Sequence, residues 1–300
     1  MISKKALIFG VNGQDGHYLN QLLCQNGLEV IGISRHSGNV LGDVSDFDFV
    51  LKIVESTKPA YIFHLAATST TNHKALFENH SSISTGTLNI LEAVRLKSPY
   101  TKIFLAGSAM QFKNEGIPIN ENTQFESSSS YSAERIYSTY LARYYRQKFG
   151  LSIYIGFLFN HDSPLRGDNH INQLIVKTAV NIANGSSEKL IIGDFSVQKE
   201  FNYAGDIVSG IWKLVIQDDL FEVVIGSGTA HTIKTWIEYC FNKLGLNWID
   251  HIEIDSRYVS EYKILISDPQ KLKSIGWNPI KDIYQVADSM VEFALEKSIK

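Results

Sequence analysis

Short apolar runs alternate with longer amphipathic segments over the first half of the chain. The apolar runs cover residues 5–10, 29–34, 60–66, 102–108 and 151–159 and predict β-strands. Between them, apolar residues at helical spacing predict helices over residues 16–27, 45–57 and 79–96 and within 127–150. Because the strands are apolar on both faces, the pattern is typical of a parallel sheet covered by helices on each side. The sequence therefore predicts an α/β fold with a doubly wound parallel sheet.

This alternation stops near residue 160, where a polar loop over residues 160–173 precedes shorter, mixed elements. Residues 267–279 have the pattern of a capped helix that ends at Gly276. No flexible linker separates the two halves. We therefore expect two lobes, residues 1–159 and residues 160–300, with the second and smaller α/β lobe folded against the first and the chain crossing between them.

Composition narrows the class of protein. The 300 residues are 44% hydrophobic and 20% charged, with a net charge of -3, which does not favour a nucleic-acid or membrane-surface partner. No apolar run reaches the length of a membrane span, and the N-terminus lacks the pattern of a signal peptide. The two cysteines, Cys24 and Cys240, lack metal-ligand spacing and are typical of a reduced, cytoplasmic protein.

A glycine-rich loop follows the first predicted strand and leads directly into a helix. Its glycines follow a GxxGxxG spacing, which lets the backbone approach a pyrophosphate while the helix N-terminus offers its N–H groups. A purely structural turn is the alternative. The loop predicts dinucleotide binding by Gly10, Asn12, Gly13, Gln14, Asp15 and Gly16.

The end of the second strand indicates which dinucleotide is bound. NAD-binding folds usually place a carboxylate there for the ribose 2′-hydroxyl, but here Arg35 and Ser37 stand with no acid before Asp43. A guanidinium beside hydroxyl groups suits a 2′-phosphate, so NADP(H) is favoured over NAD(H), unless Arg35 is only a solvated surface charge. Further cofactor contacts are expected from Asp43 and Val44 on the adenine side and from Leu65, Ala66 and Ala67 on the nicotinamide side.

Seven segments together carry a resemblance to a known family. They are "GVNGQDGHYL" (10–19), "GDVSD" (42–46), "KPAYIFHLAA" (58–67), "GTLNILEAVR" (86–95), "GFLFNHDSPLRGDN" (156–169), "IGDFSVQKEFNYAGDIVSGIW" (192–212) and "ISDPQKLKSIGW" (266–277). The chain resembles the extended short-chain dehydrogenase/reductases, in the branch of GDP-mannose 4,6-dehydratases and GDP-4-keto-6-deoxymannose reductases. The resemblance implies an N-terminal Rossmann domain and a C-terminal lobe that binds a nucleotide sugar, with a GDP-linked sugar favoured.

The resemblance also implies three catalytic positions. The family's Ser or Thr corresponds to Ser108, its Tyr to Tyr131, and its Lys, four residues after the Tyr, to Arg135. A phenol with a pKa of about 10 needs a nearby cation to exchange protons at neutral pH. Arginine keeps the charge but not the shape of lysine, so we expect weakened rather than abolished activity. The alternative is that Tyr131 is only a surface aromatic, and the other tyrosines of this helix are expected to pack or to form a dimer face.

A second departure concerns the type of reaction. The family's dehydratases carry an acid two residues after the Ser or Thr, where this chain has Met110, and the nearby Glu115 and Glu121 lie in a predicted loop. Since methionine cannot remove a proton from carbon, the sequence favours a 4-keto reductase. The alternatives are a 4,6-dehydratase, epimerase or C4 dehydrogenase with an altered acid or base. A catalytically weak homologue that acts as a binding or structural subunit is a further alternative.

The resemblance places the sugar nucleotide in the second half of the chain. It implies that Asn160, Asn169 and Lys199 lie near the diphosphate and that Arg257 and Glu261 contact phosphate and ribose, although their spacing is one residue wider than in the family. The histidines His161, His170 and His231 show no metal-ligand pattern, and no metal site is expected. Only residues 36–43 stand where the dehydratases have a long insertion that builds a tetramer, so a homodimer is expected.

Overall fold

The computed structural model describes residues 4–257 and 259–298. Its centre is a seven-stranded sheet in which every neighbouring pair of strands is parallel. In spatial order the strands are β11 (Glu222–Ile225), β6 (Ile153–Leu158), β5 (Lys102–Ser108), β4 (Tyr61–His64), β1 (Lys5–Phe9), β2 (Glu29–Ser34) and β3 (Val40–Leu41). This order reverses direction at β1, as in a Rossmann fold, and the predicted fold class is confirmed.

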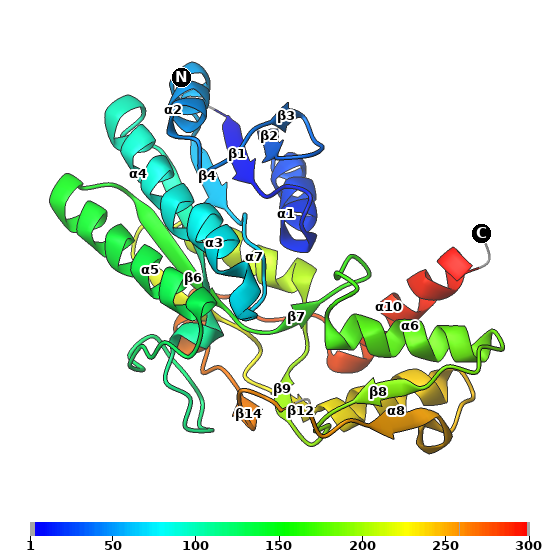
Figure 1. Ribbon diagram of the computed structural model, residues 1–300. Helices are drawn as coiled ribbons and strands as arrows, with labels where there is room; N and C mark the ends of the chain where they lie inside the picture. The colour runs from blue at the N-terminus through cyan, green and yellow to red at the C-terminus, as the bar shows by residue number, and fades with distance from the viewer. Residues whose placement is uncertain (1–3, 258, 299–300) are drawn as a thin grey trace.

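Helices cover both faces of this sheet (Figure 1). One face carries α2 (Phe47–Thr57), α4 (Gly86–Lys97) and α5 (Ser130–Phe149), and the other carries α1 (Gln14–Gln25) and α7 (Ala204–Val215). Strand β1 shows why both faces are apolar, because Leu7 and Phe9 enter the core under the first group while Ala6 and Ile8 enter the core under the second. Side chains of a strand alternate between faces, so a strand buried on both sides has no polar position.

The predicted helix over residues 79–96 is three consecutive pieces in the structure. They are α3 (Leu76–Asn79), a π-helical segment η2 (His80–Thr85) and α4. Gly86 lies at the junction, where a Cβ atom would come within 2.8 Å of the Val44 side chain. The missing side chain lets α4 approach the segment that follows β3.

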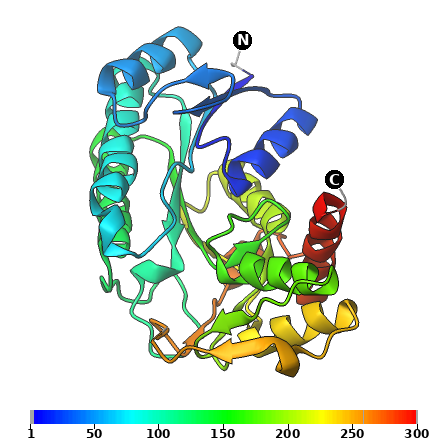
Figure 2. The same cartoon turned by 45° about the vertical axis from the view of Figure 1, so that its right-hand side comes forward.

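The second half of the chain forms a smaller lobe beyond the carboxyl ends of the sheet strands (Figures 1 and 2). Its hydrophobic core packs α6 (Ile171–Ala183), α8 (Ile233–Lys243) and α10 (Ile283–Ser298) around Trp236. The second half also contains β7 (His161–Asp162), β8 (Leu190–Ile192), β9 (Gln198–Glu200), β10 (Asn202–Tyr203), β12 (Ala230–Thr232), β13 (Ile252–Ile254), β14 (Ile264–Leu265), α9 (Gln270–Ser274) and the 3-10 turn η4 (Trp248–His251). Two further 3-10 turns, η1 (His73–Ala75) and η3 (Ala109–Gln111), lie in the first half.

The chain crosses between the two lobes more than once. After β7 and α6 in the smaller lobe, it returns to add α7 and β11 to the large sheet and then leaves again. Pairing of β11 with β6 puts Ile225 opposite Leu158 at the edge where the smaller lobe begins. The predicted boundary between the lobes, between residues 159 and 160, stays a prediction about where the chain first passes from one lobe to the other. It assigns β11 to the second lobe, although this strand belongs to the large sheet.

Candidate active site

The glycine loop between β1 and α1 has the shape that close backbone approach requires. Gly10 has a φ of +92°, and a Cβ there would come within 2.7 Å of the Ala66 backbone nitrogen. A Cβ at Gly16 would lie 2.3 Å from the Gly10 carbonyl oxygen. Gly13 caps α1 without a side-chain hydrogen bond, which leaves the N–H groups of the first turn open to an anion. These features fit the pyrophosphate of a dinucleotide.

Asn12 ties this loop to the segment after β2. Its Nδ2 donates to the Ser34 Oγ at 2.7 Å and to the Ser37 Oγ at 2.8 Å. Arg35 is exposed, and its guanidinium pairs with Glu78 of α3 at 2.9 Å. The structure therefore brings Ser37 and Arg35 to the end of β2, while the 2′-phosphate contact predicted for them stays a prediction.

The other predicted cofactor residues follow β3 and β4. Asp43 accepts hydrogen bonds from the backbone N–H and hydroxyl of Ser45, and Val44 is buried with its carbonyl bonded to Asn89. After β4 come the consecutive residues Leu65, Ala66 and Ala67. Of these, Ala66 lies against Gly10 and Leu65 reaches the pocket described next. All five stand at the carboxyl edge of the sheet, as predicted.

A cavity of about 480 Å³ opens between this edge and the smaller lobe. It brings together residues that are far apart in the sequence, including the three predicted catalytic residues. The predicted residues that line it are Asp15, Leu65, Ser108, Tyr131, Arg135, Asn160, Asn169 and Glu261. The hydroxyl-bearing residues Ser69, Thr70 and Thr71, together with Met110, Leu158, His161, Arg166, His170 and Tyr262, also line it and were not predicted as site residues.

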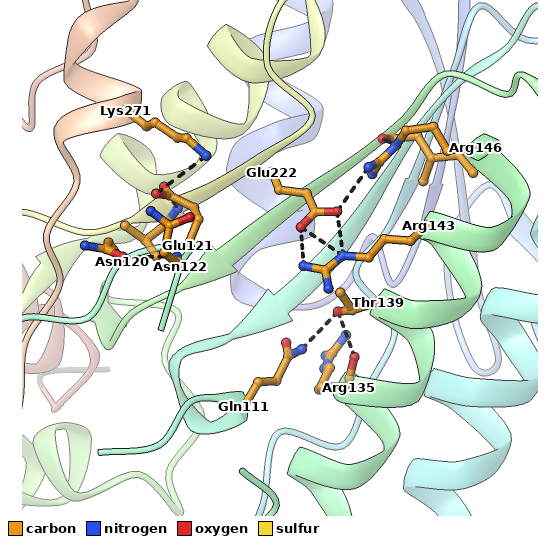
Figure 3. A network of polar contacts seen from close by, with 12 residues as sticks. Gln111, Asn120, Glu121, Asn122, Arg135, Thr139, Arg143, Arg146, Glu222 and Lys271 are labelled. Atoms are coloured by element: carbon orange, nitrogen blue, oxygen red, sulfur yellow. Dashed lines mark hydrogen bonds and ion pairs between the residues drawn. The ribbon is translucent and has the colours of Figure 1, made fainter. Parts of the chain in front are cut away.

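Ser108 ends β5 and is held by its own local turn. Its Oγ accepts the N–H of Met110, while its backbone N–H donates to Gln111 Oε1 at 2.7 Å. Gln111 Nε2 in turn donates to the Thr139 hydroxyl, which donates to the Arg135 carbonyl (Figure 3). These bonds fix the Ser108 hydroxyl oxygen at the pocket wall and leave its proton available to donate to a ligand.

Tyr131 and Arg135 lie one turn apart near the start of α5. The Arg135 guanidinium carbon lies 5.3 Å from the centre of the Tyr131 ring, and its Nη1 donates to the Ala106 carbonyl at the end of β5. Arg135 is buried, and its Nε has no hydrogen-bond partner. Burial, together with this nearby charge, lowers the pKa of His64 to about 3, so the imidazole beside Arg135 is neutral. The guanidinium is therefore the charged group at this point.

The arginines further along α5 have a structural role. Arg143 and Arg146 both bind Glu222 of β11, at 2.6 and 3.0 Å (Figure 3). Of the other tyrosines of the helix, Tyr145 is buried and donates to Glu92, while Tyr137, Tyr140 and Tyr144 are exposed. None of these four tyrosines lines the pocket.

Carboxylates near Met110 do not reach the pocket. Glu121 accepts the N–H of Val224 at 2.7 Å and lies near Lys271, and Glu115 pairs with Lys113 on the surface. Among the described lining residues the carboxylates are Asp15 and Glu261. Glu261 accepts a hydrogen bond of 2.5 Å from the Thr71 hydroxyl, across the mouth between the lobes.

Two predicted substrate residues lie outside the pocket lining. Lys199 is buried on β9 with its ammonium 5.2 Å from the centre of the Phe201 ring, and burial lowers its pKa to about 8. Arg257 is exposed and forms a bidentate pair with Asp255. Their predicted roles at the diphosphate stay predictions. Besides Arg135, the arginine that lines the pocket is Arg166, in the same "FNHDSPLRG" segment that carried the resemblance.

The described residues contain neither a metal-ligating cluster nor a membrane-spanning helix. Across residues 4–257 and 259–298, no group of three or more metal-ligating side chains is assembled. In the same part of the chain, no helix combines the length and apolar character that crossing a bilayer requires.

Rossmann topology, the open glycine loop and a pocket lined by Ser108 and Tyr131 are typical of the short-chain dehydrogenase/reductases. The chain belongs to the GDP-mannose 4,6 dehydratase family, whose model matches residues 7–290. It is 31% identical over 325 residues to GDP-mannose 4,6 dehydratase 1 of Arabidopsis thaliana, covering 98% of this chain and 90% of that protein. It is 30% identical to GDP-mannose 4,6-dehydratase of Sinorhizobium fredii (strain HH103), covering 96% of this chain and 95% of the relative.

Solved structures agree on the fold. A dTDP-glucose 4,6-dehydratase from Bacillus anthracis in complex with NAD superposes with a TM-score of 0.86 at 18% identity, over 98% of this chain and 97% of that chain. RMD from Pseudomonas aeruginosa complexed with NADPH also gives a TM-score of 0.86 at 18% identity, over 98% of this chain and 99% of that chain. At this identity the likeness establishes the fold alone.

Proposed function

We propose that this chain is an NADP(H)-dependent enzyme that transfers a hydride at carbon 4 of a GDP-linked hexose. The observation that carries the proposal is that Ser108 and Tyr131 line one pocket beside the open glycine loop. Membership in a family of nucleotide-sugar dehydratases supports the substrate class. The predicted lobes fit this function, since the dinucleotide would bind to the larger lobe and the sugar nucleotide between the lobes.

The cofactor would be held by the glycine loop and by the segment after β2. The nicotinamide supplies or accepts the hydride when the dinucleotide is bound. NADP(H) is favoured because residues 34–42 contain no carboxylate for a ribose 2′-hydroxyl and place Arg35 there instead. The Arg35–Glu78 pair is about half exposed, and an exposed pair contributes only about 0–1 kcal/mol, so a doubly charged phosphate could replace it.

The side chains divide the proton chemistry between them. Ser108 would donate a hydrogen bond to the oxygen on carbon 4, because its hydroxyl proton is not used within the protein. Tyr131 would take the hydroxyl proton as carbon 4 is oxidised and return it when carbon 4 is reduced. Arg135 would stabilise the phenolate through its charge, although the guanidinium lies over the ring and is held by Ala106.

For the overall reaction, the matched relatives favour 4,6-dehydration over the reduction that the sequence first suggested. Dehydration requires a base for the carbon 5 proton, and Met110 cannot serve as one. Glu261 is our candidate for this base, because it lines the pocket and the Thr71 hydroxyl that donates to it is neutral. This proposal corresponds to the alternative of a 4,6-dehydratase with an altered acid or base.

A 4-keto reductase is the second candidate, and Met110 favours it. Met110 lines the pocket and packs against the hydrophobic core under α5, so this wall of the pocket is apolar. An apolar wall suits the methyl group of a 6-deoxy sugar better than a hydroxymethyl group. Reduction needs only the hydride donor, Tyr131 and Ser108.

One pair of assays separates these candidates. The purified protein is incubated with NADP⁺ and GDP-mannose, and separately with NADPH and GDP-4-keto-6-deoxymannose. A 4-keto-6-deoxy product in the first assay supports dehydration, and loss of NADPH in the second supports reduction. Dehydration by Glu261 is excluded if Glu261→Gln forms the product as fast as the wild type. If the protein binds NADP(H) but turns over neither substrate, the remaining alternative is a catalytically weak homologue that acts as a binding subunit.

A further inference from the structure

A buried ion pair joins the glycine loop to the smaller lobe. His161 of β7 and Asp15 in the first turn of α1 are 146 residues apart in the sequence, and the distance from Nε2 to Oδ1 is 2.9 Å. The other ring nitrogen, Nδ1, lies 2.6 Å from the carbonyl oxygen of Phe159. The Phe159 carbonyl can only accept, so Nδ1 carries a proton, and the Asp15 carboxyl, ionised at neutral pH, accepts the proton of Nε2. His161 is therefore an imidazolium and Asp15 a carboxylate.

The surroundings of His161 agree with this assignment. Burial by itself would lower the pKa of His161, but the Asp15 carboxylate outweighs it and raises that pKa above its ordinary value. In turn, burial would raise the pKa of Asp15, while the imidazolium holds it below the usual range. The other charged or titratable groups that face the ring are Arg166 and His170, both on the loop after β7.

Arg166 is paired with another carboxylate, and His170 is uncharged. Arg166 lies 3.5 Å from the Asp162 carboxylate and donates to His170 Nδ1 at 2.9 Å. A ring nitrogen that accepts a hydrogen bond carries no proton, so His170 is neutral. Burial, with the Arg166 charge, lowers the pKa of His170 to about 4. Asp15 is therefore the only carboxylate that pairs directly with His161 among the described residues.

A second, uncharged contact crosses the same junction. The Ser163 hydroxyl donates to Gln14 Oε1 at 2.8 Å, and the Ser163 Oγ also accepts the N–H of Leu165. The Ser163 carbonyl accepts the N–H of Arg166. Two consecutive residues of the first α1 turn thus hold the turn that carries Arg166 into the sugar pocket. The same α1 turn follows directly on the glycine loop, and its N–H groups have no side-chain cap.

We propose that the Asp15–His161 ion pair is a positioning device that couples dinucleotide binding at the glycine loop to nucleoside-diphosphate binding in the pocket. The identity of the two ligands rests on the proposed function. A dinucleotide that orders the first turn of α1 fixes Asp15, which fixes His161 and the turn that carries Arg166. Coupling between sites is reciprocal, so each ligand tightens the other by the same factor.

Binding measurements test this coupling without any requirement for turnover. Calorimetry measures the Kd of NADP⁺ for the full chain with and without saturating GDP. We expect GDP to tighten NADP⁺ binding by a factor of about 5–150 in the wild type, the usual range for coupled sites. In His161→Gln this factor should fall to about 1. The control His17→Gln, whose exposed ring lies on the same helix, should keep the wild-type factor.

A pH series distinguishes coupling by charge from simple structural support. A raised pKa means that the imidazolium is present at low pH and is lost as the pH rises through that value. The coupling factor of the wild type should therefore fall at alkaline pH, while that of His161→Gln stays flat. Asp15→Asn provides the second variant if His161→Gln does not fold, and it should lose the coupling in the same way.

Two results overturn the inference. One is independent binding of NADP⁺ and GDP to the wild type, including failure of GDP to bind. The other is an unchanged coupling factor in a folded His161→Gln or Asp15→Asn protein. Absence of turnover with coupling intact would count against the proposed function only.

Discussion

The Arg135 guanidinium carbon lies over the ring of Tyr131, 5.3 Å from the ring centre. Its Nη1 is held by the carbonyl of Ala106, at the end of β5. A cation over an aromatic face interacts with the ring quadrupole, whereas one beside the oxygen stabilises a phenolate directly. That arginine replaces the family's lysine only in part stays a prediction, and variants of these two residues test it.

If Tyr131 exchanges the proton on the carbon 4 oxygen, Tyr131→Phe should lower kcat by about 10²–10⁴-fold, because positioned acid–base groups contribute that much. NADP⁺ affinity should change little, since the phenyl ring is kept. Initial rates with the active substrate from the paired assays measure the effect. Tyr137→Phe, on the exposed side of the same helix, is the matched control and should keep the wild-type rate.

Arg135→Lys should raise kcat by about tenfold, which corresponds to about 1.4 kcal/mol of transition-state stabilisation. A flexible ammonium can leave the Ala106 carbonyl and place its charge at the phenol oxygen, where it stabilises a phenolate directly. Steady-state rates at saturating substrate measure the change. Arg135→Met removes the charge at similar length and should be slower than both. A lysine variant slower than the wild type would mean that the site has adapted to arginine.

Met110→Glu should create or accelerate dehydration, by about 10²–10⁴-fold if the carboxylate acts as a base at carbon 5. Product analysis after incubation with NADP⁺ and GDP-mannose measures this. Met110→Gln has the same length without the base and serves as the control. Equal rates for the two variants would show that position 110 does not face the reacting carbon.

Glu222→Gln should destabilise the protein at neutral pH by about 1.5–3 kcal/mol, the contribution of hydrogen bonds to charged groups. Burial alone would raise the pKa of Glu222, but Arg143 and Arg146 outweigh it and hold the pKa below its ordinary value. This stabilisation is present above the unfolded pKa and is lost as the pH falls through the lower folded pKa. Urea unfolding at neutral and acidic pH should show the difference from wild type shrinking with acidification. A difference that is independent of pH would contradict the ion-pair account.

The homodimer stays a prediction, and the exposed aromatic face of α4 and α5 is where we expect it. Leu88 of α4 and Tyr137 of α5 are 37% and 46% exposed. A paired substitution, Leu88→Glu with Tyr137→Glu, should convert a dimer to a monomer, because buried carboxylates oppose association. Light scattering over a concentration series reports the mass, and Ile280→Glu, at an exposed position between α9 and α10, should leave the dimer intact. A wild-type monomer would exclude the prediction.

Local patterns predicted the elements of the first half well. The apolar runs at 5–10 and 102–108 are β1 and β5, and the glycine loop begins a helix at Gln14. Each of these is decided by neighbours in the sequence, through strand alternation or the conformational freedom of glycine. The short strand β3 and the return of β11 to the large sheet were missed, because their partners are decided by long-range pairing.

The site divides in the same way. Ser108, Tyr131 and Arg135 were assigned by resemblance to positions on a strand end and on a helix, and all three line the pocket, while their catalytic roles stay predictions. Lys199 and Arg257 were assigned by resemblance alone, and neither lines the pocket. His161 was predicted to be an ordinary loop histidine, because nothing near it in the sequence reveals a partner 146 residues away.

The sequence by itself therefore determined the doubly wound sheet, the glycine loop and the residues that local geometry places at the sheet edge. Only the tertiary structure decided where each charge stands: Arg135 over the ring of Tyr131, His161 beside Asp15, and Lys199 buried on β9. The physical reason is that the two kinds of interaction act over different separations along the chain. Apolar periodicity and backbone freedom act over a few residues, whereas the charge and orientation of a side chain depend on burial and on partners that the fold brings from distant parts of the chain.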